Sequence, residues 1–449
     1  MRSRRAAHLH PAKPSTTGAS RRGLTAPTFP DDNLTGFVIF LPFHPRAFSC
    51  RLFRRAVILI TLQTISIAAW PQTQAPISGN FKTLSAQAQQ AGEENRLDDA
   101  IVLYRKALAL RPTWADGWWS LATIQYDRDH YKEAATAFRK VIALQPDKGS
   151  PRVMLGLCEF ELGDDEGALK YIEEGRKRGL NPDEQFQRVM LYHEGVLLLR
   201  KGRFNRAGEM FSDLSKLGVQ SDELSLALGM AALRMLPKGL PEESTPGREV
   251  VRRIGRAEAL VASKKFEAAK QEYSSLISEY PEFPNIHYAL GRFLLELSDV
   301  DGAVAAFQQE IKNSPNHIPA RLQIAAARYR LDSSDGLKYA EQAVKLDPGE
   351  PFGHYLLGLL CLDTGDFSVA ISELEIAKRS YVNIPDVYFA LGNAYARAGR
   401  KQEAAQARAT FARLNAQSKK ESMETVNQDR PPGFTPGQSR PGTNLKAPQ

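Results

Sequence analysis

The chain has 449 residues, of which 59 are Lys or Arg and 51 are Asp or Glu, giving a formal net charge of +8. Apolar residues make up 43% and charged residues 24% of the sequence, which is the balance of a soluble globular protein. Ten basic and two acidic residues lie within residues 1–55, leaving 49 of the 59 basic and 49 of the 51 acidic residues for the rest of the chain. This distribution excludes a uniformly basic nucleic-acid-binding domain.

The N-terminal part of the chain divides into two segments. Residues 1–50 mix Pro, Ser, Thr and Arg without an amphipathic period, so we expect a disordered segment or an over-extended translation start. Residues 51–75 place three arginines before the uncharged run AVILITLQTISIAAW (56–70), and small residues follow. This order is typical of a secretory signal peptide, and the run is shorter than the roughly 20 residues of a membrane-spanning helix. The alternatives are a buried core helix and an uncleaved anchor that tethers the chain to a membrane through residues 56–70.

From Phe81 onward, one pattern recurs. A small residue lies inside an amphipathic stretch, an Ala follows in the next stretch, an aromatic or aliphatic residue comes four positions after that Ala, and Pro often closes the unit. The small residue recurs at Ala88, Ala122, Gly156, Gly195, Gly229, Ala257, Gly291, Ala325, Gly358 and Gly392. Six of the nine spacings equal the one between Ala88 and Ala122, which excludes chance as the explanation.

The remaining signature positions follow the same period. The second Ala recurs at Ala100, Ala134, Ala168, Ala207, Ala269, Ala303, Ala370 and Ala404, and the closing Pro at Pro112, Pro146, Pro281, Pro315 and Pro348. Over about residues 81–414 the pattern resembles the tetratricopeptide repeat, a 34-residue helix–turn–helix unit. The resemblance implies an all-α fold in which repeats stack into a right-handed superhelical solenoid. Physically, small residues at helix crossings remove bulk, aromatics opposite them are expected to fill the space between neighbouring repeats, and Pro ends the second helix.

Two segments depart from the repeat. Residues 180–184 lengthen the interval between Gly156 and Gly195, and residues 237–247 hold three prolines and two glycines where a second helix is expected, so we predict no helix there. The prediction is repeats 1–4 over residues 81–217, a degenerate repeat with a Pro-rich loop over 218–249, repeats 5–9 over 250–414, and a disordered tail over 415–449. The loop is either a tolerated insertion or a hinge or partner-contacting loop.

The sequence lacks the usual signatures of catalysis and metal binding. It contains no P-loop, Rossmann glycine motif, HExxH motif or GxSxG motif. Its eight histidines are scattered, and none in the repeats lies three or four residues from another His or from a Cys. Cys158 and Cys361 fall within the apolar pattern of first helices, where we expect buried, inert side chains. We therefore expect no enzyme activity, no cofactor and no metal site.

The surface of the first helices is the candidate binding site. The resemblance implies that these helices line a concave groove, and we place eight residues of this chain there: Trp119, Tyr126, Tyr192, Tyr288, Arg292, Tyr355, Phe389 and Asn393. This largely aromatic set favours an extended apolar peptide or a partner helix. The Lys and Asn pattern with which chaperone-binding members clamp a C-terminal carboxylate is absent. The alternative is that the tyrosines pack between repeats; if they bind instead, alanine at Tyr288 and Tyr355 weakens partner capture while helicity stays intact.

These patterns favour an exported, non-catalytic scaffold that binds other proteins or extended peptide segments. We expect the protein to be periplasmic or secreted; the alternative is a membrane-anchored protein that faces the periplasm. The alternative is a non-catalytic accessory subunit of an envelope enzyme system, such as one for polysaccharide synthesis, export or glycosyl transfer. A cytosolic nucleic-acid-binding regulator would need a basic stripe, and residues 56–449 are electrically neutral.

Overall fold

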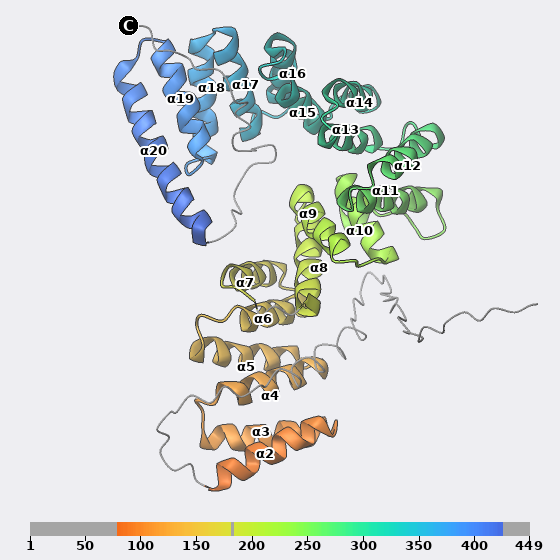
Figure 1. Ribbon diagram of the computed structural model, residues 1–449, viewed down its shortest axis with the longest axis vertical. Helices are drawn as coiled ribbons and strands as arrows, with labels where there is room; N and C mark the ends of the chain where they lie inside the picture. The colour runs from red at the N-terminus through yellow and green to blue at the C-terminus, as the bar shows by residue number, and fades with distance from the viewer. Residues whose placement is uncertain (1–78, 181–183, 425–449) are drawn as a thin grey trace, which may run out of the picture. The chain divides into compact units, whose positions relative to one another are not determined.

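The computed structural model describes residues 79–180 and 184–424, so the predictions for residues 1–50, 51–75 and 425–449 lie outside the described residues. Over the described residues the chain forms nineteen α-helices and one short 3-10 helix, with no strand. The helices, labelled as in Figure 1, are α2 (Gly79–Glu93), α3 (Leu97–Leu110), α4 (Ala115–Asp127), α5 (Tyr131–Leu144), α6 (Ser150–Glu161), α7 (Asp165–Lys177), α8 (Glu184–Arg200), α9 (Phe204–Lys216), α10 (Asp222–Ala232), η1 (Pro237–Gly239), α11 (Pro246–Ala262), α12 (Phe266–Glu279), α13 (Ile286–Glu296), α14 (Val300–Asn313), α15 (Ile318–Arg328), α16 (Ser333–Leu346), α17 (Pro351–Thr364), α18 (Phe367–Ser380), α19 (Pro385–Arg397) and α20 (Lys401–Glu424). The predicted all-α fold is confirmed.

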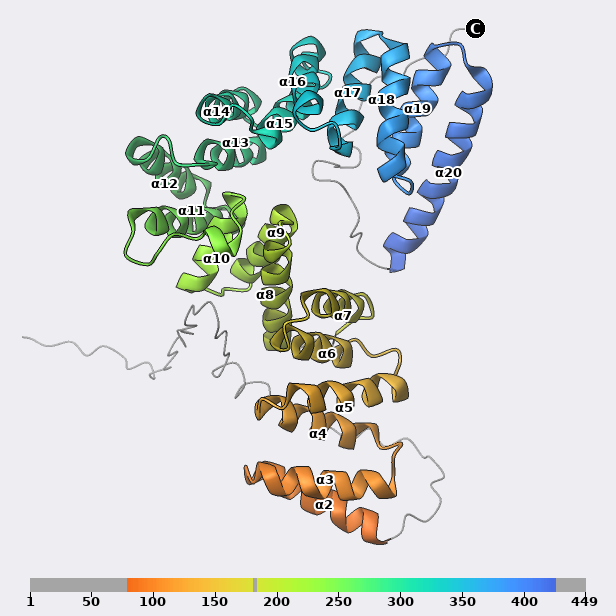
Figure 2. The ribbon, with the colours of Figure 1, turned by 180° about the vertical axis from the view of Figure 1, so that it is seen from behind.

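Most helices pack in consecutive pairs, and each pair packs on the next. The pairs α2/α3, α4/α5, α6/α7 and α8/α9 precede the irregular segment, and α13/α14, α15/α16, α17/α18 and α19/α20 follow it. Figures 1 and 2 show the two helices of each pair lying side by side from opposite viewpoints. The turn inside a pair is short and uses a left-handed residue, such as Asp129 with φ 63° or Gly163 with φ 83°. No single pair can bury its apolar face alone, so stacking supplies the core.

The recurring small residues lie where the two helices of a pair cross. A Cβ atom added at Gly195 on α8 would lie 2.5 Å from the Phe211 ring of α9. The same distance separates a Cβ at Gly291 on α13 from the Phe307 ring of α14. Both phenylalanines are fully buried. The prediction that these aromatics fill the space between neighbouring repeats is therefore wrong in detail, because they pack against the small residue of their own repeat.

The closing prolines end the second helices as predicted. Each of them follows the last helical residue by two positions, as Pro112 follows Leu110 of α3. Three of their carbonyl groups are bonded by a side chain of the next first helix, six positions further on: Trp118 with Pro112, His287 with Pro281, and His354 with Pro348, at 2.8–2.9 Å. Two of the scattered histidines therefore join consecutive repeats, a structural role that their spacing did not reveal.

The prediction that the Pro-rich segment 237–247 contains no helix is wrong in part. Pro237–Gly239 forms a 3-10 turn, and α11 begins at Pro246, inside the segment in which no helix was predicted. Proline fits the first turn of a helix, where its missing N–H group has no partner to lose. Helix α11 is 17 residues long, packs against α10 as closely as the two helices of a regular pair, and also packs against α12. Helix α11 therefore acts as the second helix of the unit that begins with α10 and as the first helix of the unit that it forms with α12.

The contact of α11 with α10 is a crossing of two glycines. A Cβ at Gly255 would lie 1.6 Å from the carbonyl oxygen of Ser225, and a Cβ at Gly229 would lie 1.9 Å from that of Val251. Real Cβ atoms do not approach backbone atoms so closely. The two backbones therefore touch, and only glycine fits at either position.

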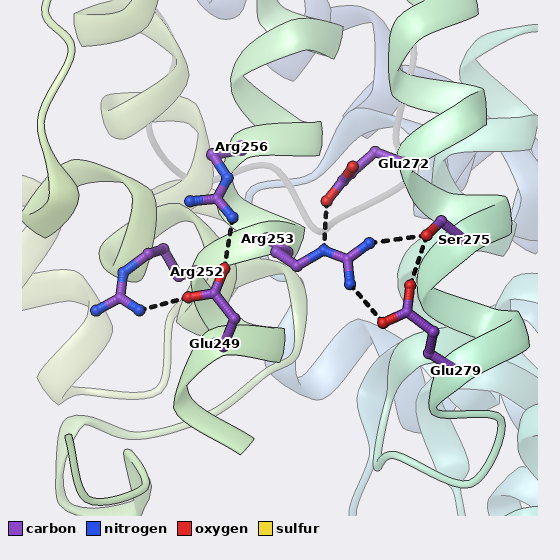
Figure 3. Close-up of polar contacts among 7 residues, drawn as sticks. All are labelled: Glu249, Arg252, Arg253, Arg256, Glu272, Ser275 and Glu279. Atoms are coloured by element: carbon purple, nitrogen blue, oxygen red, sulfur yellow. Dashed lines mark hydrogen bonds and ion pairs between the residues drawn. The ribbon is translucent and has the colours of Figure 1, made fainter. Parts of the chain in front are cut away.

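Charged side chains of α11 form polar contacts with both of its neighbours, and Figure 3 shows those with α12 and those within α11. Toward α12, Arg253 donates to Glu272 at 2.7 Å, to Ser275 at 2.9 Å and to Glu279 at 2.9 Å. This guanidinium is largely buried, which reduces competition from water.

Toward α10, Arg252 of α11 pairs with Asp222 at 2.5 Å. Glu249 accepts hydrogen bonds from Arg252 and Arg256, one and two turns further along α11, at 2.6 Å each. The polar side chains of α11 therefore stabilise its packing against both α10 and α12.

Helix α20 continues to Glu424. The prediction of a disordered tail is therefore wrong for residues 415–424. Cys158 and Cys361 are buried, as predicted, and burial raises the pKa of the Cys361 thiol to about 12. None of the helices described here is both long and apolar enough to cross a membrane.

Candidate partner-binding cleft

A cleft of about 560 Å³ lies among α9, α10, α11, the first residue of α12 and the C-terminal half of α13. Its apolar lining comes from Met210, Leu228, Ala232, Val261, Ala262 and Phe266. Its charged lining comes from Arg176, Arg206, Glu209, Asp213, Lys216, Glu258, Lys264, Arg292 and Glu296. Half of the residues that line the cleft are charged and a third are apolar, so the cleft offers both apolar contact area and charged groups to a partner segment.

The cleft lies where the pairing of the helices changes. Helix α11 packs on both α10 and α12, and it also contacts α9 directly. Residues of a second helix, α9, therefore face residues of α11 and α13, which the repeat pattern counts as first helices. The helix α11, which packs on both α10 and α12, thus helps to build this surface.

At one end of the cleft, two arginines are committed to a buried carboxylate. Glu194 of α8 is 0% exposed, and its Oε1 atom lies 3.0 Å from Arg176 and 3.5 Å from Arg206. Arg206 also pairs with Glu173 at 3.1 Å. Burial raises the pKa of Glu194, although the two arginines oppose this shift. These arginines therefore stabilise the junction of α7, α8 and α9.

At the other end, a carboxyl group is held by a tyrosine. Tyr273 of α12 is fully buried and donates a hydrogen bond to Glu258 of α11. The Tyr273 ring stacks on Phe293 of α13, with ring centroids 5.4 Å apart and planes 14° apart. Burial raises the pKa of Glu258, which favours its neutral form. Arg292 also lines the cleft, from α13, and remains half-buried.

The structure moves three of the predicted site residues into the core. Tyr288 is 1% exposed, and Tyr126 and Tyr355 are each 8% exposed. The Tyr288 ring packs against Phe307 and His317, with centroids 5.7 and 5.2 Å away. These tyrosines fill the spaces between helices, which was the alternative role considered for them. Their substitution by alanine therefore costs stability, contrary to the expectation of intact helicity.

Two further predicted residues are half-buried and pack within their own pairs. The Trp119 ring meets Phe138 of α5 edge to face, with centroids 5.5 Å apart. The Tyr192 ring lies 6.3 Å from that of Phe211 of α9. Both positions help hold the first helix on the second, and neither lines the cleft.

Of the last three predicted residues, one is exposed and two are half-buried. Phe389 of α19 is 48% exposed and rests on Phe411 of α20, with centroids 5.3 Å apart. Asn393 lies one turn further along α19 and is half-buried. Among the eight predicted residues, Arg292 alone lines the described cleft. The structure therefore does not bring the predicted aromatic residues together as one binding strip.

Sequence reasoning missed the contribution of α9. Residues such as Met210, Ser212 and Asp213 lie on a second helix, whereas the family pattern assigns the groove to first helices. The available signal was the interval between Gly229 and Ala257, which is the shortest of the nine and too short for a full repeat. This short interval marks the position of α11, the helix that is shared by two units.

Comparison with known proteins supports the repeat assignment. A family model described as tetratricopeptide repeat matches residues 85–151, 120–182, 254–318, 322–381 and 355–418, more than half of the chain. A curated relative, the protein CTR9 homolog of Arabidopsis thaliana, is 23% identical over 305 residues. The match covers 67% of this chain, which spans about a quarter (25%) of that relative.

Solved structures of repeat proteins match over different lengths. A MamA structure from Desulfovibrio magneticus RS-1 has 20% identity and a TM-score of 0.36, covering 38% of this chain and 98% of that one. The Cut9–Hcn1 hetero-tetramer of the APC/C has 12% identity and a TM-score of 0.32, covering 76% and 88%. On the family match and the paired helices of the structure, this chain belongs to the tetratricopeptide repeat family.

Proposed function

We propose that this protein is a non-catalytic scaffold that holds an extended segment of a partner protein in the cleft among α9–α13. Proteins of the tetratricopeptide repeat family bind other proteins or peptide segments and are typically non-catalytic. The observation that carries the proposal is the cleft itself, whose volume of about 560 Å³ falls within the range of ligand pockets. Its apolar lining provides contact area, and its charged groups provide orientation and specificity.

We place this scaffold in the cell envelope, the periplasm or the exterior, on the strength of the signal-like residues 51–75. N-terminal sequencing of the native protein tests this part of the proposal. A mature start near Pro76 supports export and cleavage, and a native chain that retains residues 51–75 at its start supports a membrane anchor. An intact cytosolic chain contradicts both.

The binding role is tested by filling the cleft. Ser212 lines it from α9, so Ser212→Trp places a large side chain where the partner segment would lie. Ser372→Trp on α18 is the matched control, because Ser372 is exposed and does not line the cleft. We expect crosslinked affinity capture from envelope fractions to recover the same proteins with the wild type and with Ser372→Trp, and to lose them with Ser212→Trp. Unchanged capture by a folded Ser212→Trp variant refutes the proposal.

The captured proteins also distinguish the alternative function. An accessory subunit of an envelope enzyme system would use the same cleft, with a catalytic subunit as the protein that is captured and lost.

A further inference from the structure

Five histidines lie within the residues that the structure describes, and His354 of α17 is bonded unlike the others. It is 6% exposed, and it alone among the five has an acceptor oxygen beside each ring nitrogen. Its Nε2 atom lies 2.9 Å from the carbonyl oxygen of Pro348, the closing proline of the preceding repeat. Its Nδ1 atom lies 2.5 Å from Oε2 of Glu373 on α18. The ring therefore bridges the end of one repeat and the second helix of the next.

These two contacts determine how many protons the His354–Glu373 pair holds. A carbonyl oxygen only accepts, so Nε2 carries a hydrogen atom. A second hydrogen must lie between Nδ1 and Glu373, because a nitrogen lone pair and a carboxylate oxygen repel each other at 2.5 Å. This hydrogen is either on the ring, which gives an imidazolium beside a carboxylate, or on the carboxyl group beside a neutral ring. In both forms the pair is neutral overall and holds one proton that can dissociate.

His287 of α13 is the natural comparison for His354. Its Nε2 atom lies 2.8 Å from the carbonyl oxygen of Pro281, which is again the closing proline of the preceding repeat. The residue at the repeat position of Glu373 is Ala306, whose side chain has no oxygen atom. The His287 ring therefore needs a hydrogen on Nε2 only, and the additional proton is required where Glu373 is present.

Helix α17 packs against α15, α16, α18 and α19, and the other charged and titratable side chains of these four helices are bonded elsewhere, face another residue or are exposed. Those bonded to other residues are Arg321, Arg328, Asp335, Tyr339, Glu375, Lys378, Tyr388 and Tyr395. Those exposed to solvent are Lys338, Glu341, Lys345, Arg379 and Arg397. The remaining acid, Asp386, faces Tyr355.

The neighbouring groups keep one charge state over a broad pH range. Exposed carboxylates, lysines and arginines do not change charge between about pH 5 and 9. Burial lowers the pKa of His317, which precedes α15, to about 4 and raises that of Cys361 on α17 to about 12. The pair of His354 and Glu373 is therefore the titratable contact at this junction of two repeats.

We propose that His354 and Glu373 form a pH-sensitive switch, which holds α17 and α18 on the preceding repeat in acidic surroundings and loosens them as the pH rises. Loss of the shared proton leaves a nitrogen lone pair facing a carboxylate, and the Glu373 side chain, which is 17% exposed, turns toward solvent. The folded pair holds a proton that the separated groups release, so the stability of this junction falls with rising pH. Neither residue lines the cleft, so the switch does not depend on the proposed function.

Hydrogen–deuterium exchange of the full-length protein between about pH 5 and 9 tests the switch, with protection factors used to remove the intrinsic effect of pH on exchange. The variants are Glu373→Gln and, as the matched control, Glu341→Gln, which removes an exposed carboxylate from α16. We expect protection of α17 and α18 in the wild type to fall with rising pH by up to about tenfold per pH unit, the limit for one proton. Protection around His287 should stay constant.

The two variants should differ in this dependence. The amide of Glu373→Gln donates a hydrogen bond to Nδ1 of a neutral ring without a dissociable proton, so its protection profile should be flat. Glu341→Gln should keep the dependence of the wild type. Protection of α17 and α18 that is constant in the wild type, or that falls equally in Glu373→Gln, overturns the switch.

Nuclear magnetic resonance of the wild type locates the proton directly. Nitrogen-15 shifts of labelled histidine, assigned with His354→Gln, show whether one or both ring nitrogens carry hydrogen, and the carbon-13 shift of the Glu373 carboxyl group shows whether it is ionised. At about pH 5 we expect either a doubly protonated ring or a protonated carboxyl group. A neutral His354 ring beside an ionised Glu373 at that pH contradicts the proposal.

Discussion

Replacing Gly255 with Ala tests the close crossing of α10 and α11, on which the shape of the cleft depends. The added Cβ would lie 1.6 Å from the Ser225 carbonyl oxygen and 2.9 Å from the backbone nitrogen of Gly229. Ordinary contact begins at 3.4 Å. The helices must therefore separate by about 1.8 Å at this point, which opens the packing on either side of the crossing.

The size of the effect follows from the atoms that clash. Backbone atoms of a packed helix cannot rotate away as a side chain can, so the strain is at the upper end of the cost of overpacking. The better helix propensity of Ala returns up to about 1 kcal/mol. We expect Gly255→Ala to destabilise the α10–α11 contact by about 2–4 kcal/mol.

Hydrogen–deuterium exchange measures this effect locally, which suits a repeat protein because each unit depends mainly on its neighbours. Amide exchange in α10 and α11 should accelerate roughly 30- to 1,000-fold in Gly255→Ala. The matched control is Gly208→Ala on α9, where the nearest atom is the Ala231 Cβ at 3.8 Å. That variant should be neutral or slightly stabilising. Exchange in Gly255→Ala that matches the wild type would refute the crossing and, with it, the shared role of α11.

Three further substitutions give outcomes that the structure fixes in direction. Tyr288→Ala removes a side chain that is 1% exposed and should lower the free energy of unfolding by about 3–5 kcal/mol, whereas Phe389→Ala, at 48% exposed, should lower it by about 1 kcal/mol or less. Urea unfolding followed by circular dichroism measures both values. Equal losses would contradict the assigned burial. His193 is buried, and its burial lowers the pKa to about 4, so it is neutral in the folded chain and takes up a proton on unfolding below its ordinary pKa of 6.5. The stability of α8 should therefore fall as the pH drops from about 6.5 to 4, and His193→Gln should flatten that dependence in exchange measurements; an unchanged pH profile would contradict the neutral, buried imidazole.

The sequence was sufficient to predict the repeat architecture because each signature residue has a local reason. Pro112 ends α3 whatever structure the following residues form. Gly195 permits the close approach of Phe211 inside its own repeat. These constraints recur in one repeat after another and need no knowledge of distant contacts. The start of α11 at Pro246 could also be reconciled with local rules, since proline is favoured in a first helical turn.

The dual packing of α11 and the cleft could not be predicted in this way. Whether α11 pairs with α10, α12 or both depends on the meeting of Gly255 with the backbone of α10, a contact between two helices of different units. The same limit applies to the aromatic residues of first helices. Tyr288 and Phe389 occupy the same position of the repeat, yet one is buried and the other is half-exposed. Burial at that position depends on the neighbouring units.

The central claim is that the cleft among α9–α13 holds a partner segment, and site-specific photo-crosslinking tests it most directly. A photoreactive phenylalanine analogue at Ala262 reports from the cleft, and the same analogue at Val369, which is 39% exposed on α18, reports from elsewhere on the array. In cells, Ala262 should yield a discrete adduct whose peptide mapping identifies one segment of a partner protein, and Val369 should not. The same adducts from both positions, or none from Ala262, would contradict the account.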